Sequence, residues 1–180
     1  YTIPVGGSNS SVYDQSQTWS NYITGSVDSS YPLSNLFGGN IGSGYANGTR
    51  STNPGTLTLD LSSLNITVTT ITLYTYIYNT PGTFKVNNVT VDRGTGNGDK
   101  VYTVAVNGQL NSIAWSYDSS SGPYCYMRGI EVDGKLLVDS GVSVTSVPSI
   151  SSRIQADPSK GFSIVSYTGN ATIGATVSHG

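Results

Sequence analysis

The sequence predicts an all-β fold, a sandwich or barrel built from short strands. Apolar residues alternate with polar ones along several segments, turn-forming residues separate these segments at short intervals, and no long segment carries the apolar period of a helix. The 180 residues include 22 glycines, 13 tyrosines, 28 serines and 21 threonines. This balance is typical of short strands joined by tight turns. The length leaves room for one sandwich-sized domain with a buried core and for part of another.

The segment from Tyr126 to Gly141, YMRGIEVDGKLLVDSG, is the clearest hairpin signal. Ile130 and Val132 alternate with acidic residues, which places apolar side chains on one face of a strand and carboxylates on the other. Asp133 and Gly134 both tolerate positive φ, as a two-residue type I′ turn requires. The apolar residues that follow then run back along the first strand.

Further strands are predicted after a long loop-rich block. We expect them at residues 56–61, 66–78, 84–91, 100–106 and 110–117. The alternation slips phase at Thr69 and Thr70, which predicts a bulge in the longest strand. Asn107-Gly108 predicts a turn. The block SYPLSNLFGGNIGSGYANGTRSTNPG predicts a long loop held by buried aromatic residues, with one short helical turn from Pro32 to Phe37.

The pattern divides the chain into four parts. Residues 1–12 read as an extended lead-in, residues 13–141 as the β-sandwich, residues 142–160 as a linker, and residues 161–180 as the start of a second β module. The chain begins without an initiator methionine and stops inside a patterned segment. We interpret it as a piece of a longer protein.

Charge and hydropathy exclude several classes of partner. The formal net charge is −2, charged residues make up 10% of the chain, and the basic side chains are scattered singly. This distribution predicts no binding to nucleic acid or to an anionic membrane. No apolar run is long enough to cross a bilayer. A neutral polar surface instead favours neutral partners such as sugars or sister subunits.

Few residues in the chain could support catalysis, and we predict no enzyme. The one cysteine, Cys125, lies far in sequence from the one histidine, His179, which argues against a Cys-His or Ser-His-Asp arrangement and against a zinc site. A pair of carboxylates for glycoside hydrolysis stays open. The acidic residues of the hairpin, however, fit a solvated strand face.

Calcium is the metal ion that the acidic residues fit best, because it takes carboxylate and carbonyl oxygens from turn-rich loops. Asp92 and Asp99 flank the glycine-rich loop DRGTGNGD and are the candidate ligands. Their spacing lacks the regular acidic ladder of a dedicated calcium loop, so caps on turns are the alternative interpretation. No other cofactor is predicted.

Aromatic residues in or beside loops are the candidates for recognition, because sugar rings stack on aromatic faces. The candidate glycan-binding residues are Tyr45, Arg50, Trp115, Tyr117 and Tyr124. For each of them the alternative is a structural residue that packs in the core.

Three phrases together resemble a known family. The order SYPLSNLFGGN, then TLTLDL, then RGIEVDGKLLVDSG resembles the discoidin-like, galactose-binding-domain-like module of large virion and tail-fibre proteins of cyanophages. The segment GFSIVSYTGNATIGATVSHG is similar to the start of a second, lectin-like module in the same proteins. The resemblance covers about residues 13 to 180. Gly38 stands after Phe37 where such domains commonly have an aspartate, which puts an inherited ion or ligand position there in doubt.

The resemblance implies a jelly-roll β-sandwich and a role on the surface of a phage particle. It implies a module of a tail fibre, spike or capsid-surface appendage that assembles with other virion subunits, copies of itself included, and contacts host-surface carbohydrate. A ligand-free spacer or capsid decoration protein is the alternative, and a polysaccharide-degrading spike fragment is a third. The resemblance carries no catalytic residue to this chain.

Overall fold

The computed structural model describes residues 12–52, 54–78, 82–92, 96–117 and 124–142, and it confirms the predicted all-β sandwich. The chain divides between Val144 and Thr145, and every described residue belongs to the first unit. The predicted linker and second β module lie outside the described residues, apart from Val142. So does the predicted lead-in, apart from Val12.

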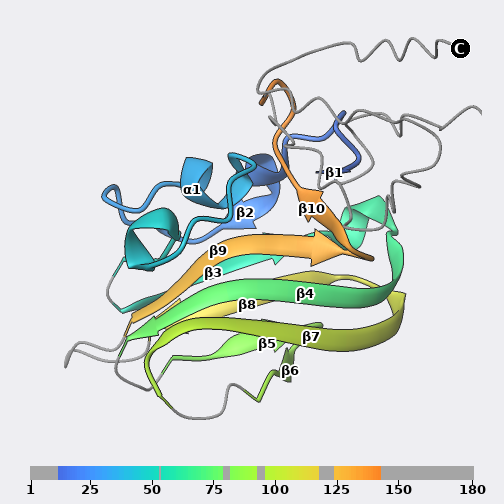
Figure 1. Ribbon diagram of the computed structural model, residues 1–180. Coiled ribbons are helices and arrows are strands. Elements are labelled where there is room, and N and C mark those ends of the chain that lie inside the picture. Colours follow the sequence, from blue (N-terminus) through green and yellow to red (C-terminus); the bar gives the residue numbers. More distant parts are fainter. Residues whose placement is uncertain (1–11, 53, 79–81, 93–95, 118–123, 143–180) are drawn as a thin grey trace, which may run out of the picture. The chain divides into compact units, whose positions relative to one another are not determined.

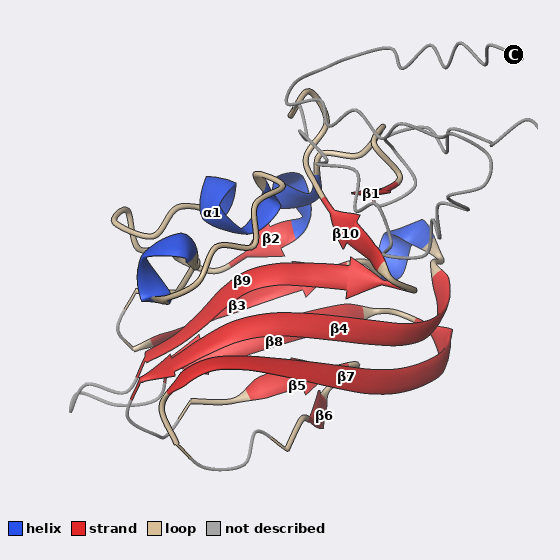
Figure 2. Cartoon of the chain, in the orientation of Figure 1, coloured by secondary structure: helices blue, strands red, loops and turns tan. Residues whose placement is uncertain are grey.

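The sandwich consists of two five-stranded sheets (Figure 2). Sheet A has the order β1-β10-β9-β4-β7, with β1 (Val12–Tyr13), β10 (Lys135–Leu137), β9 (Tyr124–Val132), β4 (Thr67–Tyr78) and β7 (Gly98–Gln109). Sheet B has the order β2-β3-β8-β5-β6, with β2 (Ile23–Thr24), β3 (Gly55–Asp60), β8 (Ser112–Tyr117), β5 (Phe84–Val86) and β6 (Val89–Thr90). The short strand β1 pairs in parallel with β10, and the other pairs are antiparallel.

The core fills the space between the two sheets, which lie one behind the other in Figure 1. Its residues come from alternating positions, as the period of a half-buried strand requires. Leu57 and Leu59 of β3 and Ile71 and Leu73 of β4 are fully buried. Trp115 of β8 packs in the same core. The alternation read from the sequence is therefore the alternation of core and surface.

The hairpin predicted after Tyr126 is confirmed. Ile130 and Val132 are fully buried, while the carboxylates that alternate with them are not. Asp133 and Gly134 have φ values of 48° and 75°, as the predicted turn requires. Lys135 pairs with Val132 across it.

Two local predictions are wrong. Residues 84–91 form a tight hairpin, β5 and β6, rather than one strand, because Asn87 and Asn88 both adopt positive φ (49° and 65°). Residues 107 and 108 do not turn the chain, and β7 continues through them to Gln109. Asn107 takes up positive φ (49°) inside the strand, next to the register shift between Val68 and Thr70.

The helical content is small. The described helices are α1 (Leu33–Phe37) and three 3₁₀ turns, η1 (Trp19–Tyr22), η2 (Tyr45–Asn47) and η3 (Ser62–Leu64). The first of these confirms the helical turn predicted after Pro32. Within the described ranges, no helix combines the length and the apolar character that a membrane span needs.

Candidate functional site

Six tyrosines gather on the outer face of sheet A, at the end where β4 finishes and β9 begins. We call them the tyrosine cluster: Tyr31, Tyr45, Tyr76, Tyr78, Tyr124 and Tyr126. Four of them come from the two strands, because Tyr76 pairs directly with Tyr126 and Tyr78 with Tyr124 in the antiparallel register. Directly opposed residues share one face of a sheet, so the register itself brings these rings together.

The other two rings come from the loops around α1 and pack onto the strand tyrosines. Tyr31 lies 4.9 Å from Tyr126 between ring centroids, in an edge-to-face arrangement. Tyr45 lies 5.8 Å from Tyr76 and 5.9 Å from Tyr126. Such geometries are the ones that aromatic pairs prefer, and they fix each ring against its neighbours. Tyr126 is buried at the centre, whereas Tyr45 and Tyr78 keep 51% and 45% of their surface exposed.

A single cation, the guanidinium of Arg50, lies among these rings. Its central carbon is 4.2 Å from the ring centroid of Tyr124, 4.7 Å from that of Tyr31 and 5.5 Å from that of Tyr126. A cation within this range of several aromatic faces is attracted by each of them. Arg50 therefore links the strand tyrosines to the loop tyrosines.

Asp28 neutralises this cation. Its Oδ2 atom accepts hydrogen bonds from Arg50 Nε at 3.0 Å and from Arg50 Nη2 at 2.7 Å. Its other oxygen accepts the backbone N–H of Ser30 at 2.9 Å. The remaining terminal nitrogen of Arg50 lies 3.4 Å from the hydroxyl of Tyr126. Each nitrogen of the guanidinium thus donates a hydrogen bond within the protein, and Asp28 occupies one edge of the group.

The ionisation of these groups follows from their contacts. Burial raises the pKa of Asp28, but the hydrogen bonds from Ser30 and Arg50 outweigh it and hold that pKa below its ordinary value. Burial lowers the pKa of Arg50, but the hydrogen bond to Asp28 and the interactions with Tyr126 and Tyr124 together outweigh it, so the pKa is raised. Burial raises the pKa of Tyr126 well above its ordinary value, against the nearby charge of Arg50. At neutral pH the site therefore holds one compensated ion pair beside the neutral phenol of Tyr126.

Tyr45 owes its position to hydrogen bonds that hold the loop of residues 38–48. The carboxylate of Asp99 on β7 accepts the backbone N–H of Gly44 at 3.0 and 3.3 Å. Asn35 of α1 donates its side-chain N–H groups to the carbonyls of Ala46 and Gly48, both at 3.1 Å. Hydrogen bonds to β7 and to α1 therefore hold the loop that carries Tyr45, the most exposed ring of the cluster.

A buried arginine completes the attachment of this loop. The register of β4 against β9 shifts between Tyr74 and Thr75, and Arg128 is the unpaired residue on β9 at that point. Bulges of this kind re-aim a side chain. The guanidinium of Arg128, only 5% exposed, donates to the carbonyls of Thr75 and Gly42 and lies 3.5 Å from Asp99. One ion pair thus joins β9, β7 and the loop.

The structure brings together three of the five residues predicted to bind glycan, namely Tyr45, Arg50 and Tyr124. Trp115 lies elsewhere: it is 1% exposed, and its indole N–H donates to the carbonyl of Thr49 at 3.1 Å. Trp115 is therefore a structural residue that packs in the core, and its ring offers no free face to a sugar. Tyr117 is the last residue of β8, and its side chain lies outside the described part of the chain.

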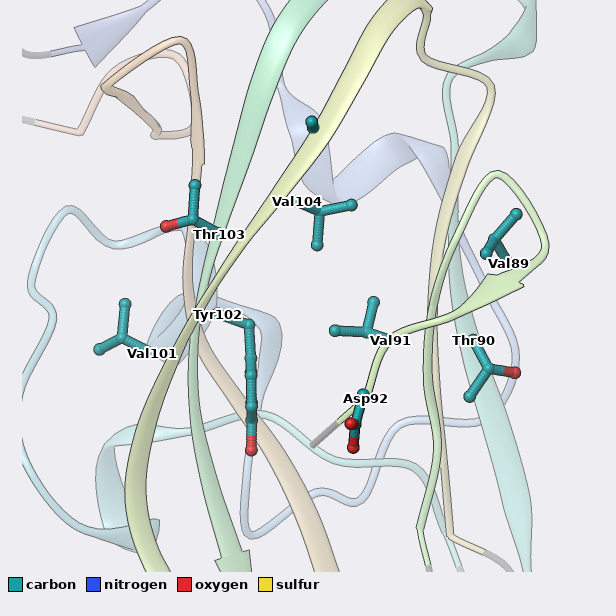
Figure 3. Close-up of a pocket in the computed structure, with 9 residues that line it drawn as sticks. Val89, Thr90, Val91, Asp92, Val101, Tyr102, Thr103 and Val104 are labelled. Atoms are coloured by element: carbon teal, nitrogen blue, oxygen red, sulfur yellow. The ribbon is translucent and has the colours of Figure 1, made fainter. Parts of the chain in front are cut away.

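The two predicted calcium ligands have different surroundings. Asp99 bonds to Gly44 and pairs with Arg128, as a structural carboxylate does. Asp92 follows β6 and lines a groove between β6 and β7 (Figure 3). Within the described ranges, no group of three or more His, Cys, Asp or Glu side chains is arranged to hold a metal ion. Asp99 thus fits the alternative interpretation, in which a carboxylate fixes a turn, because it accepts the backbone N–H of Gly44 at the start of η2.

Comparison with protein-family models, with curated proteins and with solved structures finds no match for this chain. Function is therefore inferred from the geometry of the described residues.

Reasoning from the sequence missed four of the six tyrosines of the cluster, Tyr31, Tyr76, Tyr78 and Tyr126. Tyr76, Tyr78 and Tyr126 belong to strands, and only loop aromatics were considered as candidates. A signal was present, because Tyr76 and Tyr78, like Tyr124 and Tyr126, are two residues apart and so share one face of a strand. The pairing of β4 with β9 brings these two pairs of tyrosines onto one surface. No short pattern in the sequence indicates that pairing.

Proposed function

We propose that this chain is an adhesion module that binds an uncharged glycan on the exposed part of the tyrosine cluster. The observation that carries the proposal is the exposure of Tyr45 and Tyr78, at 51% and 45%, on a set of rings already fixed by one another and by Arg50. Aromatic faces held in advance bind a sugar ring with little loss of side-chain entropy.

The charges in the site favour a neutral ligand over an anionic one. Arg50 is the cation within the cluster, and Asp28 occupies the edge of its guanidinium. An acidic sugar would have to displace Asp28 to form the bidentate contacts that make arginine selective for carboxylates. A neutral pyranose needs only ring faces and hydrogen-bonding groups, which the phenol hydroxyls supply.

The biological setting we propose is a tail fibre, spike or capsid-surface appendage of a phage, with host-surface carbohydrate as the ligand. This setting, and the jelly-roll connectivity, are drawn from the resemblance to discoidin-like cyanophage modules. A ligand-free structural part of the particle is the second candidate. It is favoured by the contacts of Arg50 with the rings of Tyr31, Tyr124 and Tyr126, because such a cluster also stabilises a fold without any ligand.

A glycan array of neutral and acidic oligosaccharides, followed by titration calorimetry on any glycan bound, tests the proposal. We expect saturable binding of neutral glycans that is lost in Tyr45→Ala and weakened in Tyr78→Ala. Tyr74→Ala is the matched control, because Tyr74 lies on the same face of β4 outside the cluster. Circular dichroism would check that each variant is folded.

Three results would count against binding at this site. Failure of the wild-type chain to bind any glycan would favour the structural role. Equal loss of binding in Tyr45→Ala and Tyr74→Ala would place the ligand elsewhere. New reducing ends released from a polysaccharide during the same incubation would favour a degrading enzyme instead.

A further inference from the structure

The strand β7 is an unprotected edge of sheet A. It pairs with β4 along its length and, among the described strands, has no neighbour on its other side. An edge strand presents half of its backbone N–H and C=O groups away from the sheet, and those groups favour pairing with another extended chain. Proteins commonly protect such an edge with proline, with charges, with a β-bulge or with a short strand. Here the strand has twelve residues and no proline. Its charged residues, Asp99 and Lys100, stand together at one end, and its irregularity, with Asn107 at positive φ, lies at the other, so residues 101–105 between them carry none of these protections.

An apolar groove runs beside this edge. It lies between β7 and the edge of sheet B at β6, and its walls carry Val91 and Val104 (Figure 3). Val89 and Val101, at its margins, are 70% and 57% exposed. The groove and the edge form one continuous surface, rich in valine.

The large exposed hydrophobic side chains of the described residues fall into two groups. Tyr45 and Tyr78 belong to the tyrosine cluster, and Val89 and Val101 belong to this groove. Tyrosine carries a hydroxyl that water can hydrate, whereas the surface of valine is apolar throughout. Exposed apolar side chains gathered at one place favour contact with another protein.

We propose that β7 pairs antiparallel with β7 of a second copy of this chain, about a two-fold axis at Thr103, so that sheet A continues across the dimer. The edge itself selects an extended strand as the occupant, because only a strand satisfies a row of alternating donors and acceptors. A two-fold dimer needs a surface that is complementary to itself, and β7 meets that condition.

The register follows from the alternation of the strand. Directly opposed residues point to the same face of a sheet, so a two-fold axis must pass beside a residue and not between two. An axis at Thr103 pairs residues 101–105 of one copy, the regular stretch between the charged end and the bulge, with residues 105–101 of the other. It sets Val101 opposite Ala105 and Thr103 opposite its own copy, both favourable cross-strand pairs.

The charges accept this register as well. Asp99 and Lys100 of one copy extend toward the bulge of the other, where residues 106–109 carry no charge, so no like charges are opposed. An axis one residue further along, at Val104, would set Val101 against Asn107 of that bulge instead. The Thr103 register is therefore centred on the regular part of the strand and keeps Val101 opposite an apolar side chain. With a net charge of −2, two copies repel each other only weakly.

Sedimentation velocity of the 180-residue chain across a concentration series tests the proposal. We expect a monomer–dimer equilibrium. Val101→Lys combined with Ala105→Lys sets like charges opposite each other twice in the dimer and should weaken dimerisation by about tenfold or more. Val101→Lys combined with Ala105→Glu sets opposite charges in the same places and should restore it. Ser63→Lys, an exposed residue outside the groove, adds one of these positive charges elsewhere and should change nothing.

Each remaining outcome overturns the proposal. A wild-type chain that sediments as a monomer at its highest soluble concentration excludes the dimer. If the β7 amides of that monomer are protected from hydrogen exchange, another segment covers the edge. A dimer that tolerates the two double variants equally uses a different surface. Circular dichroism on all variants separates loss of association from loss of fold, because the substituted side chains are exposed in the single chain.

Discussion

Asp133 and Thr70 bond to each other twice. Asp133 Oδ1 accepts the backbone N–H of Thr70 at 2.8 Å, and the backbone N–H of Asp133 donates to the carbonyl of Thr70 at 3.0 Å. The same carboxylate oxygen accepts the N–H of Thr69 at 2.9 Å. The bulge of β4 lies between Val68 and Thr70. The aspartate of the hairpin turn therefore satisfies backbone donors at the bulge, so each feature stabilises the other.

Replacing this aspartate should destabilise the fold more than its exposed position suggests. Asp133→Ala removes the two hydrogen bonds that the carboxylate accepts from Thr69 and Thr70 and puts alanine at a φ of 48°, so we expect the free energy of unfolding to fall by about 2 kcal/mol. Asp133→Asn keeps an amide oxygen and tolerates positive φ, so its loss should be smaller. Urea denaturation followed by circular dichroism measures both.

Asp60→Ala is a suitable control for this prediction. Its carboxylate is exposed and bonds only to Ser62, two residues along the chain. If Asp133→Ala lost no more stability than Asp60→Ala, the bridge to the bulge would be shown to contribute nothing.

Features of the fold that depend on residues close together in the sequence could be predicted. The β9–β10 hairpin and the bulge near Thr69 were predicted because alternation and turn chemistry are local signals. The hairpin at Asn87-Asn88 was missed because two asparagines in a row are also common in loops and signal positive φ less strongly than Asn-Gly. Asn107-Gly108 carries the Asn-Gly signal and was nevertheless wrongly predicted to turn the chain, because β7 accommodates the positive φ of Asn107 inside the strand. Turn chemistry in the sequence thus indicates positive φ more reliably than it indicates the end of a strand.

The site was less readable, because it is assembled by strand pairing. Arg50 and Tyr124 were selected as loop aromatics or cations, yet the partner that neutralises Arg50, Asp28, is 22 residues away. Arg128 appeared to be an ordinary strand residue, and only the bulge on β9 turns its side chain toward the loop that carries Tyr45. Such contacts depend on tertiary register, which no short pattern in a single sequence specifies.

Arg50→Lys should loosen the tyrosine cluster although it keeps the charge. Lysine has no planar group that could donate two hydrogen bonds to Asp28 Oδ2. It also cannot reproduce the contacts of the guanidinium with the ring faces of Tyr31 and Tyr124. We expect a loss of about 1 to 2 kcal/mol in unfolding free energy and a reduced tyrosine signal in near-ultraviolet circular dichroism. The exposed Lys85→Arg on β5 provides the comparison. An unchanged near-ultraviolet spectrum would show that Arg50 does not order the rings.

Acid should destabilise the fold in part through Asp28. Its pKa in the folded state lies below the ordinary value of 3.8, so the unfolded chain binds this proton more readily. The stability it contributes is therefore present above about pH 4 and is lost as the pH falls through the folded pKa. Asp28→Asn removes this contribution. Its unfolding free energy should accordingly decrease less than that of the wild type between about pH 5 and about pH 3.

Asp14 and Asp60 also have lowered pKa values, but they titrate in both proteins and cancel in the difference. Urea denaturation at a series of pH values gives the comparison. Parallel curves for wild type and Asp28→Asn would mean that this carboxylate has the same pKa in both states.

Gly82 packs against Cys125 too closely to admit a side chain. A β-carbon on Gly82 would lie 2.1 Å from Cys125 Sγ and 2.8 Å from the carbonyl oxygen of Ser116. Gly82→Ala must therefore push β9 and β8 apart at the edge of the core, and we expect a loss of about 3 kcal/mol in unfolding free energy. Cys125→Ala removes the nearer obstacle and leaves the Ser116 carbonyl in place. The double variant should thus be less destabilised than the sum of the two single changes, by about 1 kcal/mol in a double-mutant cycle measured by urea denaturation. Strict additivity would mean that the sulfur of Cys125 is not what excludes a side chain at Gly82.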